Sequence, residues 1–156
     1  MRSSVDVHNS LLADEVPHEL SRLPGPLRDL TAAPAVLGLP ASAVARPTVL
    51  ADREGMVLVL APANLEVSTA LVGELLGRNA LHQLAADRAP GLTGYLLPFV
   101  PPVALECPAM VVVDEQLTRE GVVYTAAGEP GVILKIRGFD LAKVTGAVVS
   151  QVTGQA

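Results

Sequence analysis

Residues 92–103 read Leu-Thr-Gly-Tyr-Leu-Leu-Pro-Phe-Val-Pro-Pro-Val. The stretch is apolar almost throughout, so we expect it to be buried or to line a pocket. Its prolines, Pro98, Pro101 and Pro102, argue against a regular helix or a central strand. An apolar segment with few backbone donors and a flexible Thr-Gly start suits the wall of a small-ligand pocket. A buried crossing loop that only fills space has the same composition, so both interpretations stay open.

Predicted strands lie on both sides of this stretch. They cover residues 45–51, 56–61, 80–84, 110–113, 121–126, 131–136 and 147–152. Residues 56–60 and 110–113 are apolar at consecutive positions, which is typical of strands that are covered on both faces. We therefore expect these two runs to form neighbouring buried strands.

Predicted helices cover residues 3–13, 31–38, 64–77 and 139–144. On the first helix, Val5, Leu11 and Leu12 form the expected inner stripe. On the third, we expect the side with Leu71 and Leu75 to pack on the sheet. This mixture of hairpins and isolated helices predicts an α+β fold with a mixed, strongly curved sheet.

The composition limits the classes of function. The 156 residues have the size of one domain, which we expect to span residues 1–156. Apolar residues make up 50% and charged residues 17%, a balance that argues against disorder. The net charge of −5, without a long basic run, argues against DNA or a long duplex as the partner. A short nucleic-acid end remains a candidate, because few phosphate contacts are then needed.

Individual reactive residues indicate no reaction. Cys107 is the only cysteine, so no internal disulfide can form, which fits a reducing cytoplasm. We interpret Cys107 as a packed residue, His18 as packed or solvated, and the pair Asp114-Glu115 as a strand-ending cap. Because zinc spacings, phosphate loops and nucleophile elbows do not occur, we expect neither a metal nor a cofactor. The sequence has no signal peptide or membrane-spanning run, so we expect a cytoplasmic protein that does not bind membranes.

Four pieces of the sequence occur together in a characteristic order. They are Ala-Val-Leu-Gly-Leu-Pro at 35–40, Val-Ala-Arg-Pro-Thr-Val-Leu at 44–50, Thr-Gly-Tyr at 93–95 with the Pro-Pro pair, and Val-Val-Val-Asp-Glu at 111–115 with Ala-Ala-Gly-Glu-Pro-Gly at 126–131. In order and spacing, the set resembles the YbaK/prolyl-tRNA synthetase-associated family of trans-editing domains. The likeness covers nearly the whole chain, from about Val7 onward.

The resemblance implies a mixed sheet curved into a barrel-like shape, with helices around it. It also implies hydrolysis of the ester between a wrong amino acid and the acceptor end of tRNA, most often tRNA-Pro, with an aminoacyl-tRNA synthetase as a further partner. Backbone groups that orient water and stabilise the oxyanion can suffice for an activated ester, which fits the lack of a catalytic motif. A small, dry pocket favours a small amino acid such as alanine.

The resemblance also places the site. The family lysine falls on Arg46, which with Gly128 forms the expected catalytic pair. Arg46 should reach the pocket mouth near Gly94 and Gly128. The alternative is a surface arginine paired with an acidic neighbour such as Asp52 or Glu54. The expected substrate-binding residues are Thr93, Gly94, Tyr95, Pro98, Phe99, Pro101, Pro102, Ala127 and Ile133.

Three departures from the family pattern keep other functions open. Arg46 retains a cation but cannot act as a general base. Pro98 replaces a loop glycine and removes one backbone donor. Ile133 stands where some members are polar or acidic. A non-catalytic binder of aminoacyl-tRNA and a regulatory interaction module are therefore the alternatives to an aminoacyl-tRNA deacylase.

Overall fold

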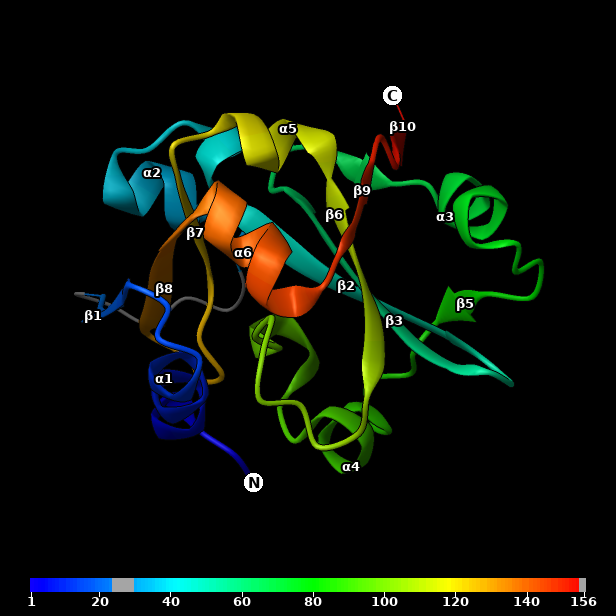
Figure 1. The fold of residues 1–156 in the computed structure, drawn as a ribbon, viewed down its shortest axis with the longest axis horizontal. Helices are drawn as coiled ribbons and strands as arrows, with labels where there is room; N and C mark the ends of the chain where they lie inside the picture. Colours follow the sequence, from blue (N-terminus) through cyan, green and yellow to red (C-terminus); the bar gives the residue numbers. More distant parts are fainter. Residues whose placement is uncertain (24–29, 155–156) are drawn as a thin grey trace.

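The computed structural model describes residues 1–23 and 30–154, and its strands form three sheets (Figure 1). The largest sheet has the spatial order β5-β2-β3-β6-β9. Strand β2 pairs antiparallel with β3 and β5, whereas β3 with β6 and β6 with β9 are parallel pairs. The bounds are β2 Ala45–Asp52, β3 Gly55–Pro62, β5 His82–Gln83, β6 Ala109–Asp114 and β9 Val148–Ser150.

A three-stranded antiparallel sheet adjoins the first one. Its spatial order is β1 (His18–Arg22), β8 (Val132–Arg137) and β7 (Val122–Ala126). A bridge between Val44 and Tyr124, and a 2.9 Å hydrogen bond from Thr125 Oγ1 to the Ala45 carbonyl, connect β7 to the start of β2. The third sheet pairs β4 (Glu66–Val67) with β10 (Thr153–Gly154).

The predicted α+β class with a mixed sheet is confirmed by these pairings. The strongly curved, barrel-like shape is not confirmed. Within residues 1–23 and 30–154, β5 and β9 each pair on one side, so the five-stranded sheet does not close. The physical reason is that β7 contacts only the beginning of β2, while β5 pairs with the other end of β2 along the same edge.

Helices cover both faces of the sheets. One face packs against α1 (Ser4–Ala13), α4 (Ala89–Thr93), α5 (Glu115–Arg119) and α6 (Gly138–Thr145). The other face packs against α2 (Ala33–Leu37) and the short η1 (Ala41–Ala43) over the small sheet, and α3 (Thr69–Leu76) over the large one. Among the described helices, none has the length and apolar character needed to span a membrane.

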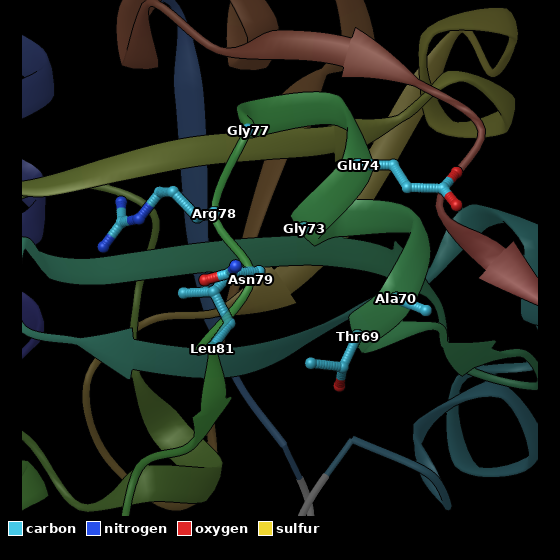
Figure 2. Close-up of a pocket in the computed structure, with 8 residues that line it drawn as sticks. All are labelled: Thr69, Ala70, Gly73, Glu74, Gly77, Arg78, Asn79 and Leu81. Carbon is cyan, nitrogen blue, oxygen red and sulfur yellow. The ribbon is translucent and has the colours of Figure 1, made fainter.

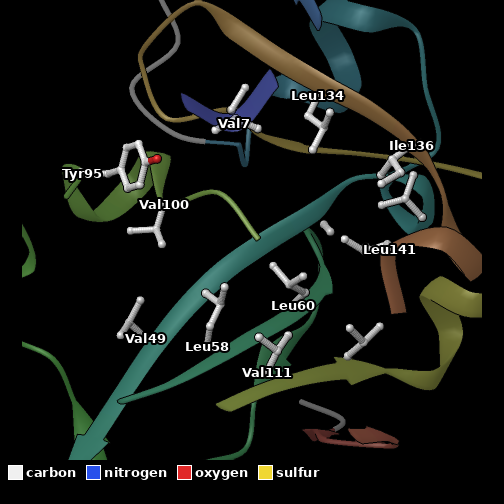
Figure 3. Close-up of a cluster of buried hydrophobic side chains, with 14 of the residues drawn as sticks. Val7, Val49, Leu58, Leu60, Tyr95, Val100, Val111, Leu134, Ile136 and Leu141 are labelled. Carbon is white, nitrogen blue, oxygen red and sulfur yellow. The ribbon is translucent and has the colours of Figure 1, made fainter. Parts of the chain in front are cut away.

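The main core lies between the sheets and α1, α6 and the 92–103 stretch (Figure 3). Strand β3 shows how the sheet divides the interior. Leu58 and Leu60 point into the main core, while Val57 and Val59 point toward α3. Because β3 is covered on both faces, it is apolar at every position, as a central strand must be.

The predicted neighbours β3 and β6 are confirmed as a buried parallel pair, with Leu58 opposite Val111. Each of them lies between two other strands, so neither is an edge. One detail of the prediction is wrong, because Met110 is 46% exposed and the buried part of β6 begins at Val111. Asp114, which ends β6, caps α5 by accepting from the Gln116 N–H, and also binds Val152 N and Thr153 Oγ1.

The predicted inner stripe of α1 is wrong at two of its three positions. Leu11 is fully buried, but Val5 and Leu12 are 62% and 56% exposed. The second buried residue is Val7, which stands four positions before Leu11 and therefore lies on the same side of the helix. Ser3 caps the helix in a capping box with Asp6.

The third predicted helix begins later than expected. Residues before Ser68 form β4, and the Ser68 hydroxyl accepts from the Leu71 N–H at 3.2 Å to cap α3. Val72 is fully buried under the helix, whereas Leu75 is 36% exposed. The expectation that the Leu71–Leu75 side packs on the sheet is therefore wrong. Val72 and Leu76, four positions apart on one face of the helix, make the contact instead.

A shielded ion pair supports the β2–β3 hairpin. The Arg78 guanidinium binds the Asp52 carboxylate through two nitrogens, one of them Nε at 2.9 Å, and also the Gly55 carbonyl at 2.9 Å. The two side chains are 8% and 6% exposed. The hydrogen bond from Arg78 lowers the pKa of Asp52 to about 2.

The burial of α1 predicts different effects for two adjacent leucines. Leu11→Ala should lower the free energy of unfolding by about 2–5 kcal/mol, because it leaves a cavity in the core. Leu12→Ala, the matched control, should change it by no more than about 0.5 kcal/mol. Urea unfolding measures both, and equal losses would show that the packed face of α1 is misassigned.

The low pKa of Asp52 predicts a pH-dependent stability. The folded state favours the carboxylate, so its contribution is complete above the ordinary pKa of 3.8 and is lost as pH falls through about 2. Asp52→Asn should therefore destabilise the protein at pH 7, and the difference from wild type should shrink below about pH 4. Glu54→Gln is the control, since the Glu54 side chain is 72% exposed. A difference that stays constant down to acid pH would contradict the assignment.

Candidate active site

A cavity of about 250 Å³ opens at the edge of β2, and we call it the Arg46 cavity. It lies along the part of β2 between the bridge to β7 and the pairing with β5. Pro47 suits this place, because a proline cannot donate to a sheet and is tolerated on an edge. The lining residues are Arg46, Pro47, Thr48, Val49, Glu66, Gln83, Leu84 and Leu97.

Arg46 places a cation at this cavity. Its Nη2 donates to the Leu65 carbonyl at 3.1 Å and lies 3.6 Å from Glu66 Oε1. The Arg46 side chain is 27% exposed, whereas that of Glu66 is 86% exposed. A guanidinium carries up to five N–H donors, so these two contacts leave donors available for a ligand.

Thr93 and Gly94 end α4 and have structural contacts. Thr93 is 1% exposed, and its hydroxyl donates to the Ala89 carbonyl at 2.7 Å. Gly94 adopts φ +92°, which a side chain rarely allows, and its carbonyl accepts from the Arg2 N–H at 3.1 Å. A Cβ on Gly94 would meet Arg2 Cδ at 2.9 Å, so Arg2 covers this glycine closely.

Tyr95 is fully buried against Gly128. A Cβ on Gly128 would lie 2.8 Å from Tyr95 Cε1, so only glycine permits this approach. The Tyr95 hydroxyl donates to the Ala104 carbonyl at 2.8 Å, and burial raises the pKa of Tyr95 to about 12. Tyr95 therefore acts as a neutral packing residue that ties the 92–103 stretch to the turn at Gly128.

The prolines of the stretch have different surroundings. Pro98 is exposed in the short helix η2 (Leu97–Phe99), while Pro101 and Pro102 are buried. Phe99 is 8% exposed, and its carbonyl accepts from the Gly128 N–H at 3.0 Å. This bond occupies the backbone donor of the residue that we expected to be catalytic.

Ala127 and Ile133 lie away from the Arg46 cavity. Ala127 is fully buried in the main core. Ile133 is 2% exposed and packs in a second cluster with Val44 and Ala126. Both side chains pack against other protein residues, so a substrate-binding role for either stays a prediction.

The structure brings some of the expected site residues together and separates others. Arg46 meets the 92–103 stretch at Leu97, which lines the same cavity. Gly94 and Gly128 are not part of the lining, because the Arg2 side chain and the Tyr95 ring cover them. The expected position of Arg46 near these glycines is therefore not observed in the described chain.

The alternative expectation, an arginine paired with an acidic side chain, agrees with the contact between Arg46 and Glu66, although neither residue named as an example is the partner. Arg46 pairs with Glu66, and not with Asp52 or Glu54, which both bind Arg78. The sequence did not identify Pro47, Thr48, Val49, Glu66, Gln83 and Leu84 as cavity residues. The proline on β2 was a signal for an open edge, but nothing local identified the residues that reach that edge from other strands.

A larger cavity, of about 420 Å³, lies beside α3 (Figure 2). Its lining residues are Thr69, Ala70, Gly73, Glu74, Gly77, Arg78, Asn79 and Leu81. Figure 2 shows the Glu74 and Arg78 side chains pointing in opposite directions, and the Arg78 guanidinium already binds Asp52. Because its charged groups do not converge, this cavity is a weaker candidate for ester chemistry than the Arg46 cavity.

The remaining reactive side chains of the described residues do not suggest a metal centre. Among residues 1–23 and 30–154, no group of three His, Cys, Asp or Glu side chains is placed to hold a metal ion. His18 is packed, as predicted, with Nδ1 against the Val16 carbonyl and Nε2 against His8 Nδ1, both at 2.8 Å. Cys107 is partly buried against the main core.

Comparisons with known proteins add independent information. A family model described as "Aminoacyl-tRNA editing domain" matches residues 25–144. A solved structure of the hypothetical protein APE2540 is 29% identical, with a TM-score of 0.88, and the match covers 96% of this chain and 99% of that one. A "putative trans-editing enzyme for prolyl tRNA synthetase" is 23% identical, with a TM-score of 0.88 and 99% of both chains covered, which supports the fold. A search of curated proteins finds no match.

The family match includes the parts that line the Arg46 cavity, namely β2 with Arg46, β4 with Glu66, β5 with Gln83 and the 92–103 stretch with Leu97. It also includes the turn at Gly128, which lies outside the lining. The mixed fold agrees with that of the trans-editing structure over nearly the whole length. The chain belongs to the aminoacyl-tRNA editing domain family.

Proposed function

We propose that the protein is an aminoacyl-tRNA deacylase that acts in trans and removes a mischarged small amino acid, with tRNA-Pro as the first candidate. The observation that supports this most is a cation, Arg46, at a small cavity on an open strand edge of an editing domain. The partner is the acceptor end of tRNA, and an aminoacyl-tRNA synthetase is a candidate for delivering it. We place the reaction in the cytoplasm.

The proposed reaction needs no protein nucleophile. A water oxygen bonds to the ester carbonyl carbon, the bond from that carbon to the ribose oxygen breaks, and the ribose oxygen takes a proton. Arg46 would stabilise the negative charge on the carbonyl oxygen, or hold a phosphate of the terminal adenosine, by a charge-assisted hydrogen bond. Its guanidinium stays protonated, so the proton must leave through water or the tRNA itself.

The size of the cavity favours a small amino acid. Leu84 and Leu97 supply apolar walls, while Arg46, Thr48, Glu66 and Gln83 make much of the lining polar, so the cavity is not the dry pocket that we expected. Its total volume of about 250 Å³ must also admit the ester and a water molecule. A pocket of this kind selects by excluding larger side chains. Each additional methylene that fits is worth only about 1–3 kcal/mol, so exclusion is the stronger filter.

A non-catalytic binder of aminoacyl-tRNA is the second candidate. Two backbone donors that an oxyanion site would use are not available: Gly128 N–H binds the Phe99 carbonyl at 3.0 Å, and Pro98 has no N–H. Binding of a non-hydrolysable aminoacyl-adenosine analogue without turnover of any ester would favour this candidate.

A panel of mischarged tRNAs tests the proposed activity. We expect ester loss to be fastest for alanine or a residue of similar size and slow for phenylalanine, because the cavity excludes large side chains. The measurement is the release of labelled amino acid above the rate without enzyme. Absence of any release would refute the deacylase proposal, and faster release of phenylalanine would refute the size argument.

Substitution of Arg46 tests its role. Arg46→Ala should lower kcat/KM at least about tenfold, because a charge-assisted hydrogen bond is worth about 1.5–3 kcal/mol and each 1.36 kcal/mol is a factor of ten. Arg46→Lys should keep a measurable part of the activity if the charge matters. Arg53→Ala is the control, since Arg53 is exposed in the β2–β3 turn. Unchanged binding and hydrolysis in Arg46→Ala would remove Arg46 from the site.

A further inference from the structure

The open edge of β2 presents a hydrogen-bond acceptor to the Arg46 cavity. The Ala45 carbonyl accepts from Thr125 of β7 and the Val49 carbonyl accepts from the Leu84 N–H, so both point away from β3. Alternate residues of a strand point their carbonyls to the same side, and Pro47 lies midway between these two. The Pro47 carbonyl therefore points into the gap between β7 and β5 on this edge. The Pro47 nitrogen has no hydrogen to donate there.

Glu66 brings a second acceptor to the same cavity. Pairing of Glu66 with Gly154 of β10 fixes the backbone of β4 at this position. One carboxylate oxygen, Oε1, lies 3.6 Å from Arg46 Nη2, and the side chain is otherwise 86% exposed. The carboxylate has several lone-pair sites, so a ligand can bind it while its contact with Arg46 is kept.

The lining of the cavity thus includes donors on Arg46 and two kinds of acceptor, the Glu66 carboxylate and the Pro47 carbonyl. An aminoacyl ester has matching groups, because its α-ammonium group stands two bonds from the carbonyl carbon. A ligand that directs its carbonyl oxygen to Arg46 brings the ammonium group close to Glu66, whose carboxylate lies 3.6 Å from the Arg46 guanidinium. Three N–H donors of an ammonium group suit such a pair of oxygen acceptors.

We infer that Glu66, with the Pro47 carbonyl, binds the α-ammonium group of the aminoacyl ester. This rests on the proposed function and adds a recognition element to the same site. The consequence is selection for a free amino group, so that esters with a blocked α-nitrogen, such as peptidyl esters, bind poorly. Glu66 is then a specificity-determining residue that touches the substrate.

A purely structural role is the competing interpretation of Glu66. In that case the carboxylate only holds the Arg46 side chain in position. Its removal would then affect every ester alike, whatever group stands on the α-carbon. Two esters that differ only at that position therefore separate the two roles.

The experiment compares alanyl-tRNA with lactyl-tRNA, in which a hydroxyl replaces the ammonium group. Glu66→Gln should lower kcat/KM for the alanyl ester about tenfold or more and leave that for the lactyl ester within about twofold. Each value is divided by that of the wild type for the same ester, because the ammonium group itself activates the ester. Glu74→Gln, an exposed glutamate outside the Arg46 cavity, is the matched control. Equal losses for both esters would overturn the inference.

A binding measurement distinguishes failure of this inference from failure of the proposed function. The probes are adenosine analogues that carry an alanyl or a lactyl group through a stable 3′-amide. If the wild type hydrolyses neither ester but binds the alanyl probe more tightly, and Glu66→Gln removes that preference, the deacylase proposal fails and the inference stands. If the wild type shows no preference, or binds neither probe, the inference is wrong.

Discussion

The contact between Tyr95 and Gly128 is the constraint on which the rest of the site depends. The Tyr95 ring is fully buried where a side chain at position 128 would stand, and its hydroxyl is bound to the Ala104 carbonyl. This contact joins the 92–103 stretch to the turn between β7 and β8. The Gly128 N–H then binds the Phe99 carbonyl, which positions η2. Leu97 of η2 forms one wall of the Arg46 cavity as a result.

The sequence predicted those parts of the fold whose cause is local. A continuous apolar run such as β3 requires cover on both faces, and this identified β3 and β6 as neighbours. Hydrophobic periodicity gave a wrong prediction where pairing with a strand far away in the sequence decides the local structure. Residues 64–67 have a helical pattern, yet Glu66 and Val67 pair with β10 at the far end of the chain. Local sequence patterns likewise could not predict whether the sheet closes, because closure depends on how many residues of β7 pair with β2.

The candidate site was predictable only in part for the same reason. Resemblance to a family pointed to Arg46 and to the proline-rich stretch, and Arg46 and Leu97 do line one cavity. The β4–β10 pairing brings Glu66 to that cavity, and the β2–β5 pairing brings Gln83 there. No sequence motif predicts either pairing. The resemblance made Gly128 an expected catalytic residue, but its close contact with Tyr95 accounts for a glycine at this position without any catalytic role.

The charge of the protein bears on the proposed binding of tRNA. With a net charge of −5, the chain as a whole does not attract a polyanion. Arg46 is moreover partly neutralised by Glu66, whose carboxylate lies 3.6 Å away. Few phosphates are neutralised at such a site, so little binding energy comes from the release of counterions. Under the proposed function, recognition would then rest on the short-range fit of the acceptor end to a cavity that holds both a guanidinium and a carboxylate.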